Sequence, residues 1–165
     1  MKAFVAVVAL GLSACATVPA GGSALPASIS YETTPCFGFC PVYKVTVNAD
    51  GTGTFVGERN TSVSGARTFR VTAPQYAAFA RHLAPVRPVS GEVAYNPGNC
   101  QPYATDLPGV RVEWTGTDGA RQLLSVDKGC GSEEARAAAR RLDAAPALLP
   151  IGEWTKRPEG APLTR

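Results

Sequence analysis

Cysteines are the residues of this sequence with the clearest capacity for chemistry, and four of the five follow an apolar N-terminal segment. An even number of cysteines in a secreted chain is typical of a disulfide framework, and four cysteines allow three pairings. We expect Cys36 to pair with Cys40, because only three residues separate them. We expect Cys100 to pair with Cys130, because both flank a predicted hairpin.

Two other chemistries are open to these four cysteines. A thiol–disulfide redox protein could use Cys36 and Cys40, although redox pairs ordinarily have two intervening residues at a helix N-terminus, and here Pro41 and a strand follow. Four cysteines could also bind zinc, but their spacing matches no common zinc finger. Haem attachment needs Cys-x-x-Cys-His, which the sequence lacks. We therefore expect no metal and no cofactor.

The fifth cysteine, Cys15, has a different setting. Lys2 is followed by a short apolar run and then by small residues, which is the pattern of a secretory signal peptide over residues 1–14. The apolar run is too short to span a bilayer, which needs about 20 residues. The last four residues of this segment, Leu-Ser-Ala-Cys, resemble the lipobox of bacterial lipoproteins.

The resemblance to a lipobox implies cleavage before Cys15 and attachment of acyl chains, such as palmitate, that hold the protein stably on a membrane. The alternative is ordinary cleavage near Ala14, which leaves a free thiol. Residue 16 is Ala and not Asp, and by analogy with lipoprotein sorting this favours the outer membrane of the cell envelope, facing the periplasm. Residues 15–27, rich in Ala, Gly, Pro and Ser, are expected to form a flexible tether.

The sequence offers little for catalysis. It contains one histidine, His82, which we expect at the flank of a helix or in water, and it has no Gly-x-Ser-x-Gly motif. The candidate binding residues are Asp106, Tyr95 and Tyr103, in or beside the long loop predicted between residues 86 and 109. We expect Asp106 mainly to bond backbone N–H groups of that loop, and a small-molecule site there is the alternative.

Alternating polar and apolar residues predict strands over residues 29–33, 42–48 and 52–58, and again on both sides of residues 117–119. Each hairpin has a three-residue turn that ends in Gly, which predicts a left-handed residue at the third position. The first turn then places Val45 opposite Phe55, and the second places Val112 opposite Leu124. A further short strand is predicted at Val93–Tyr95.

Two helices are predicted from caps and apolar stripes. Thr72 caps the first helix with Gln75 at the capping-box position, and Ser132 caps the second. Prolines end both helices. The expected inner faces are Tyr76, Phe79, Ala80 and Leu83 in the first helix, and Ala135, Ala138, Ala139 and Leu142 in the second.

These elements predict one α+β domain over residues 28–156, an antiparallel sheet of hairpins with the two helices packed on one face. Residues 157–165 show no pattern and are expected to form a disordered tail. Of the 165 residues, 45% are hydrophobic and 18% are charged, which is sufficient for a core and too little charge for a disordered chain. The net charge of +3 comes without a basic stripe, so we expect no nucleic-acid partner.

The segment from Thr34 to Tyr43 reads Thr-Pro-Cys-Phe-Gly-Phe-Cys-Pro-Val-Tyr. It resembles a bacterial family of unknown function, whose short secreted or lipid-anchored members have a C-F-G-x-C-P-x-Y signature. Thr105-Asp106-x-Pro108 and Glu153-Trp154 are similar too, so the resemblance covers about residues 29–154. It implies no catalytic residues, because the activity of the family is unassigned.

Together these features predict a lipid-anchored periplasmic protein that acts as a non-enzymatic binding or structural module. Its expected contacts are the membrane, through the anchor, and an unidentified envelope protein or cell-wall partner. The redox protein and the small-molecule binder described above are the alternatives.

Overall fold

A computed structural model describes residues 25–158 and residue 160 of the chain. The predicted signal peptide, Cys15, most of the tether and most of the C-terminal tail lie outside these residues. The elements are, in order, β1 (Ser28–Thr33), β2 (Val42–Asn48), β3 (Thr52–Arg59), β4 (Gly65–Arg70), α1 (Ala73–Leu83), the 3₁₀ helix η1 (Ala84–Val86), β5 (Gly91–Tyr95), β6 (Gly109–Thr115), β7 (Arg121–Asp127), α2 (Glu133–Ala144) and the 3₁₀ helix η2 (Ala145–Leu148).

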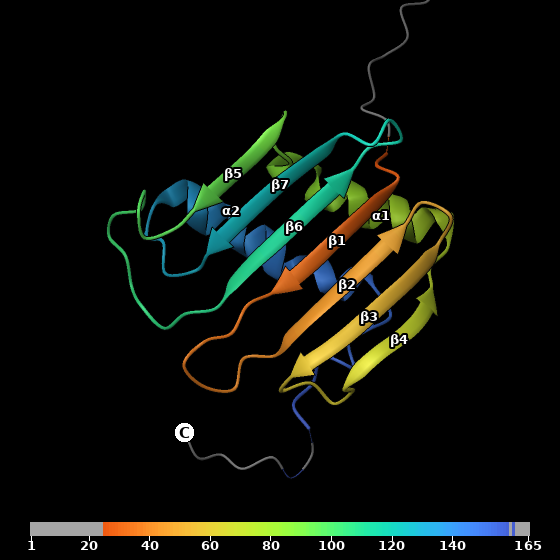
Figure 1. Ribbon diagram of the computed structural model, residues 1–165, viewed down its shortest axis with the longest axis horizontal. Helices are drawn as coiled ribbons and strands as arrows, with labels where there is room; N and C mark the ends of the chain where they lie inside the picture. Colours follow the sequence, from red (N-terminus) through yellow and green to blue (C-terminus); the bar gives the residue numbers. More distant parts are fainter. Residues whose placement is uncertain (1–24, 159, 161–165) are drawn as a thin grey trace, which may run out of the picture.

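The seven strands form one sheet in the order β4-β3-β2-β1-β6-β7-β5. Figure 1 shows α1 and α2 on the same side of this sheet, so the α+β class and the helical layer are confirmed. The expectation of a purely antiparallel sheet is wrong, because β5 pairs with β7 in parallel. Strand β5 comes before the β6–β7 hairpin in the chain. In the sheet it lies next to β7, on the side away from β6.

Both predicted hairpin registers are confirmed. Val45 lies opposite Phe55 in the β2–β3 hairpin, and Val112 lies opposite Leu124 in the β6–β7 hairpin. The reason is the same in each turn: the third loop residue, Gly51 or Gly119, has a φ of +83° or +80°. This left-handed conformation is open to glycine at little cost.

The sequence did not reveal β4. Its residues are mostly exposed, as in an edge strand, and the alternation that marks a half-buried strand is missing. A single ring, Phe69, turns inward over Gly53 and contacts the indole of Trp154 at a centroid distance of 5.9 Å. Trp154 also packs on Phe55, so the C-terminal turn covers this end of the core.

Both helices begin as predicted. The Thr72 hydroxyl accepts from the backbone N–H of Gln75, whose side chain accepts from the backbone of Thr72. The Ser132 hydroxyl accepts from the N–H of Ala135 in α2. The apolar stripe of α1 is buried, with Phe79 and Leu83 fully enclosed, and only Ala139 of the predicted α2 stripe is part-exposed.

His82 lies at the flank of the α1 stripe, but it is half-buried and not in open water. Its ring Nε2 donates to the carbonyl of Arg141 at 2.8 Å, and Arg141 Nη1 donates to the carbonyl of His82 at 3.1 Å. A helical wheel of α1 alone could not predict these hydrogen bonds, because the partner residue lies on α2.

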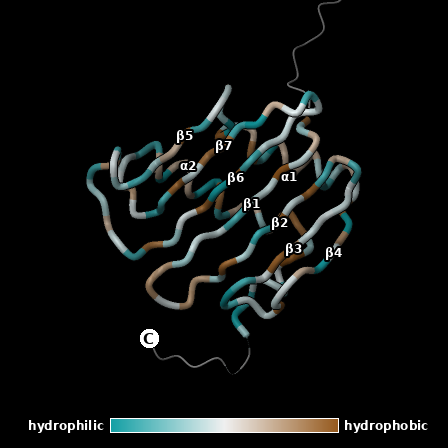
Figure 2. Tube along the Cα trace, viewed as in Figure 1, coloured by the Kyte–Doolittle hydropathy of each residue, from teal (hydrophilic) through white to brown (hydrophobic). Residues whose placement is uncertain are grey.

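The core lies between the sheet and the helical layer. Hydrophilic and hydrophobic residues interleave along the strands (Figure 2), as expected for a sheet with one face packed and one face open. Among the buried residues, Tyr31 donates a hydrogen bond to the carbonyl of Leu142 at 3.2 Å, which ties the central strand β1 to α2.

None of the helices within residues 25–158 has the length and apolar character that a membrane crossing requires.

Candidate functional site on the open face of the sheet

Both helices lie on one face of the sheet, and within the described residues no helix covers the outward side chains of the other face. The cross-strand pairs place a row of hydroxyls on this face: Thr68 lies opposite Thr54, Thr54 opposite Thr46, and Thr46 opposite Ser30. We call these four residues the hydroxyl row. At about 4.8 Å between strands, the hydroxyl row crosses four strands over about 14 Å.

Longer side chains stand beside the hydroxyl row. On one side, Lys44, Glu32 and Arg111 lie opposite one another on β2, β1 and β6. Lys44 Nζ is 3.9 Å from Glu32 Oε2, and both groups are part-exposed. Arg111 is exposed, and no hydrogen bond or ion pair of its side chain is found within the described part of the chain.

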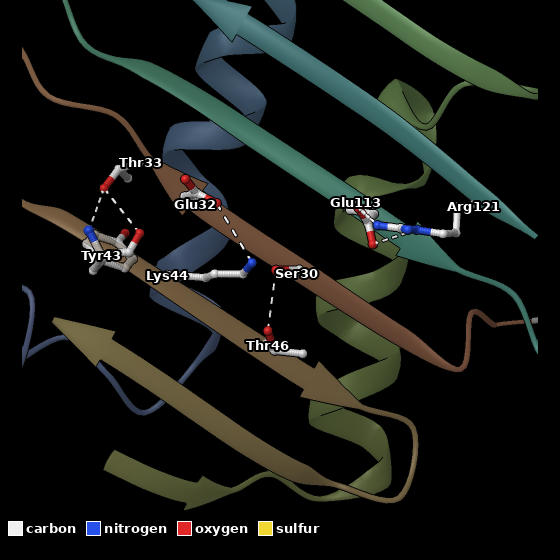
Figure 3. A network of polar contacts seen from close by, with 8 residues as sticks. All are labelled: Ser30, Glu32, Thr33, Tyr43, Lys44, Thr46, Glu113 and Arg121. Carbon is white, nitrogen blue, oxygen red and sulfur yellow. Dashed lines mark hydrogen bonds and ion pairs between the residues drawn. The ribbon is translucent and has the colours of Figure 1, made fainter. Parts of the chain in front are cut away.

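The hydroxyl row ends at Glu113, which lies opposite Ser30 on β6. Figure 3 shows Glu113 paired with Arg121 beside Ser30 and Thr46. Arg121 donates to both carboxylate oxygens, at 3.0 Å and 2.5 Å, and this bond raises the pKa of the Arg121 guanidinium. Thr46 Oγ1 donates to Ser30 Oγ at 3.3 Å.

The short central side chains and the longer charged ones beside them enclose a shallow depression of about 240 Å³. Its lining includes hydroxyls, carboxylates and cations, and no aromatic side chain. Such a surface offers donors, acceptors and charges of both signs to a polar partner. No hydrogen bond from one of its hydroxyls to a carboxylate or to Lys44 is found in the described structure; the Thr46 hydroxyl bonds to that of Ser30.

Comparison with protein families gives one match, which covers residues 27–146 and is described as Domain of unknown function (DUF6438). The chain belongs to this family. The match starts just before β1 and ends within η2, so it contains the whole sheet and both long helices. No curated protein and no solved structure shows significant similarity to the chain.

Within the DUF6438 domain both predicted disulfides are formed. Cys36 and Cys40 are bonded with their Cα atoms 5.8 Å apart, and Cys100 and Cys130 with theirs 5.2 Å apart. No helix begins at the Cys36–Cys40 loop, which connects β1 with β2. The helix dipole that lowers the pKa of a redox thiol is therefore missing there.

The Cys36–Cys40 loop of the DUF6438 domain is held from three directions. The N–H of Phe37 donates to the carbonyl of Asp106 at 3.1 Å, and Asn60 Nδ2 donates to the carbonyl of Cys40 at 3.1 Å. The guanidinium carbon of Arg157 lies 4.2 Å from the centre of the Phe39 ring. The loop thus joins the long 96–108 segment and the C-terminal residues.

Two of the three candidate binding residues lie together. Tyr95 and Tyr103 both pack against the Cys100–Cys130 disulfide, and Tyr103 also donates from its hydroxyl to Asp127 Oδ2 at 2.7 Å. The hydrogen bond with Asp127 raises the pKa of Tyr103, and the negative charges of Asp127 and Asp106 raise it further. These contacts anchor the long segment to β7 and to the disulfide.

Asp106 has a φ of +69°, a left-handed conformation that Asp tolerates better than most residues. Its carbonyl accepts from Phe37, and its side chain accepts from the Thr105 hydroxyl at 3.1 Å. The expected bonds from its carboxylate to loop N–H groups are not found in the described structure. Its structural contribution comes through its backbone.

The outward residues of β1, β2 and β6 were not proposed as a site from the sequence. Alternation indicates that Lys44 and Thr46 face away from Val45, but it cannot say which strands lie beside β2.

Ser125-Val-Asp-Lys128 has the Ser-x-x-Lys spacing of some acyl-transfer enzymes. Ser125 lies on β7 and not on a helix, and Lys128 Nζ pairs with Asp143 at 2.5 Å.

The described residues hold no group of three or more His, Cys, Asp or Glu side chains arranged to bind a metal ion.

Proposed function

We propose that this protein is a lipid-anchored, non-enzymatic binding module of the bacterial cell envelope, and that the open face of its sheet binds an envelope partner. The observation that carries the proposal is the polar open face, in which the hydroxyl row lies between charged side chains. A sheet left open on one side, with hydrogen-bonding groups at regular strand spacing, suits a partner rich in donors and acceptors.

The anchor is the second part of the proposal and rests on the lipobox resemblance at Cys15. Cys15→Ala removes the sulfur that receives the lipid, so the variant should leave the membrane fraction and lose its acyl groups. Fractionation with high-salt and carbonate washing, together with mass spectrometry of the N-terminal peptide, measures both. A variant that stays in the washed membranes contradicts the anchor.

The binding face is tested with charge reversals of equal net effect. Lys44→Glu combined with Arg111→Glu changes the open face, whereas Arg67→Glu with Arg140→Glu changes two exposed cations that face away from it. Sedimentation of the Cys15→Ala protein with isolated envelope fragments should show binding that the first pair weakens and the second pair preserves. Equal binding by both double variants contradicts a role for the open face.

A further inference from the structure

A second surface lies on the helical side of the sheet, away from the open face, and contains a pocket of about 470 Å³. Its walls come from the chain just before β1, the C-terminal half of α1, the turn after η1 and the paired strands β6 and β7. A volume of this size is within the range of small-molecule sites.

Trp114 forms part of the pocket wall, and its indole N–H is the main evidence for a ligand site. Only 1% of this residue is exposed, and among the described residues its indole Nε1–H has no hydrogen-bond partner. Leaving a buried donor without an acceptor is costly, and nearly all such groups in native proteins are paired. The nitrogen has less than 1 Å² of accessible surface, so an acceptor from outside the chain reaches it only after a local movement of the pocket wall, and would then remove this cost.

The polar groups around the pocket are mainly donors. Arg87 donates through Nε and Nη2 to Gln122 Oε1, at 3.2 Å and 2.8 Å, so the amide oxygen of Gln122 is already occupied. Arg81 adds a second cation, and within the described chain neither arginine pairs with a carboxylate. No Asp or Glu lines the pocket, although Asp118 lines the adjacent depression of about 240 Å³.

The rest of the wall is apolar. Pro26, Ala80, Ala84 and Pro88 contribute carbon surface, and Val89 at the rim is fully exposed. Pro26 is fixed in place because its carbonyl accepts from the Tyr76 hydroxyl at 2.6 Å. A ligand here therefore needs an apolar body for the wall and an anionic acceptor for the donors.

We propose that this pocket binds a small amphipathic anion, a carboxylate on an apolar chain, with the carboxylate accepting from Trp114 Nε1–H and facing Arg81 and Arg87. The probe is octanoate, with octan-1-ol as the same chain without the charge and inorganic phosphate as an anion without the chain. The protein is the full chain carrying Cys15→Ala, so that no acyl group of its own competes.

The readout is the indole N–H signal of Trp114 in ¹H–¹⁵N spectra, distinguished from that of Trp154 by the Trp114→Phe variant. Octanoate should move this signal and slow its hydrogen exchange, and octanol and phosphate should bind at least tenfold more weakly. An unmoved Trp114 signal, or binding of octanol or phosphate as tight as that of octanoate, overturns the proposal.

Variants test the same site by another measurement. By calorimetry, Trp114→Phe should weaken octanoate binding on the order of tenfold, because it removes a donor to a charged group. Arg81→Gln should weaken it several-fold, and Arg67→Gln, on the distant strand β4, should leave it unchanged. If Arg81→Gln and Arg67→Gln bind octanoate equally, the assigned role of the cations is wrong, whether or not Trp114→Phe folds.

Discussion

His82 and Arg141 hold the two helices together through a reciprocal pair of bonds: the imidazole Nε2 donates to the Arg141 carbonyl at 2.8 Å, and the Arg141 side chain donates to the His82 carbonyl at 3.1 Å. The residues are 59 positions apart in the sequence. The single histidine of the chain is thus a structural link between α1 and α2.

This link makes His82→Ala more costly than a surface substitution. The change removes a donor and leaves the carbonyl of Arg141 without it, so we expect the free energy of unfolding to fall by about 1 kcal/mol. Arg81→Ala, at the neighbouring exposed position, should change it by less than about 0.5 kcal/mol. Urea denaturation of both variants measures the difference. Equal effects contradict the structural role of His82.

Two phenylalanines provide a matched comparison of burial. Phe79 in α1 is 0% exposed, and Phe37 in the Cys36–Cys40 loop is 74% exposed. Phe79→Ala should cost about 3–5 kcal/mol of unfolding free energy, because it opens a cavity in the core. The identical change at Phe37 should cost less than about 1 kcal/mol. Similar denaturation midpoints for the two variants would refute the packing of α1 on the sheet.

The two disulfides should differ in their effect on stability. Replacing Cys100 and Cys130 with Ala should lower the unfolding free energy by about 2–4 kcal/mol, because their ring spans a sequence separation of 30 residues. Replacing Cys36 and Cys40 should cost less, because a separation of 4 residues restricts the unfolded chain less. Thermal unfolding of both double variants tests the order, and the reverse order would contradict it.

The buried tyrosines predict a loss of stability in alkali. Burial raises the pKa of Tyr43 and of Tyr76 from 10.0 to about 12, and it raises that of Tyr31 further. Because these pKa values are higher in the folded state than in the unfolded state, the neutral phenols contribute to the free energy of unfolding. This contribution is complete below pH 10 and decreases as the pH rises through 12.

The unfolding free energy measured by urea denaturation should therefore fall steeply between pH 10 and 12. Tyr31→Phe lacks one of the three groups, so its stability should fall less over the same interval, although it also loses the bond to Leu142. A stability that is constant from pH 9 to 12 is incompatible with the burial of these phenols.

Local features of the fold were predictable from the sequence, and features that depend on strand order were not. The register of Val45 with Phe55 followed from alternation and from a three-residue turn that ends in Gly. The edge strand β4 escaped because its outward and inward residues are both mostly polar or exposed. A short strand at Val93–Tyr95 was predicted, but its parallel pairing was not, because nothing local shows that β7 lies between β5 and β6.

The same limit applies to the sites. The disulfide pairs were predictable from spacing and from the hairpin, and both formed as expected. The hydroxyl row joins residues of four strands, so Thr68 and Ser30 meet on one surface only once the strand order is known. The sequence could not show that the indole N–H of Trp114 lacks an acceptor, because this depends on which groups the surrounding elements place near it.

We propose that the open face of the sheet meets an envelope partner in the cell. A photo-crosslinking amino acid at Thr54, on the hydroxyl row, and at Arg67, which faces away from the row, tests it directly in cells that express the full chain with Cys15 unchanged. We predict a discrete crosslinked product from Thr54 that disappears when Lys44→Glu and Arg111→Glu are added, and no such product from Arg67. The same product from both positions, or none from Thr54, would contradict the claim.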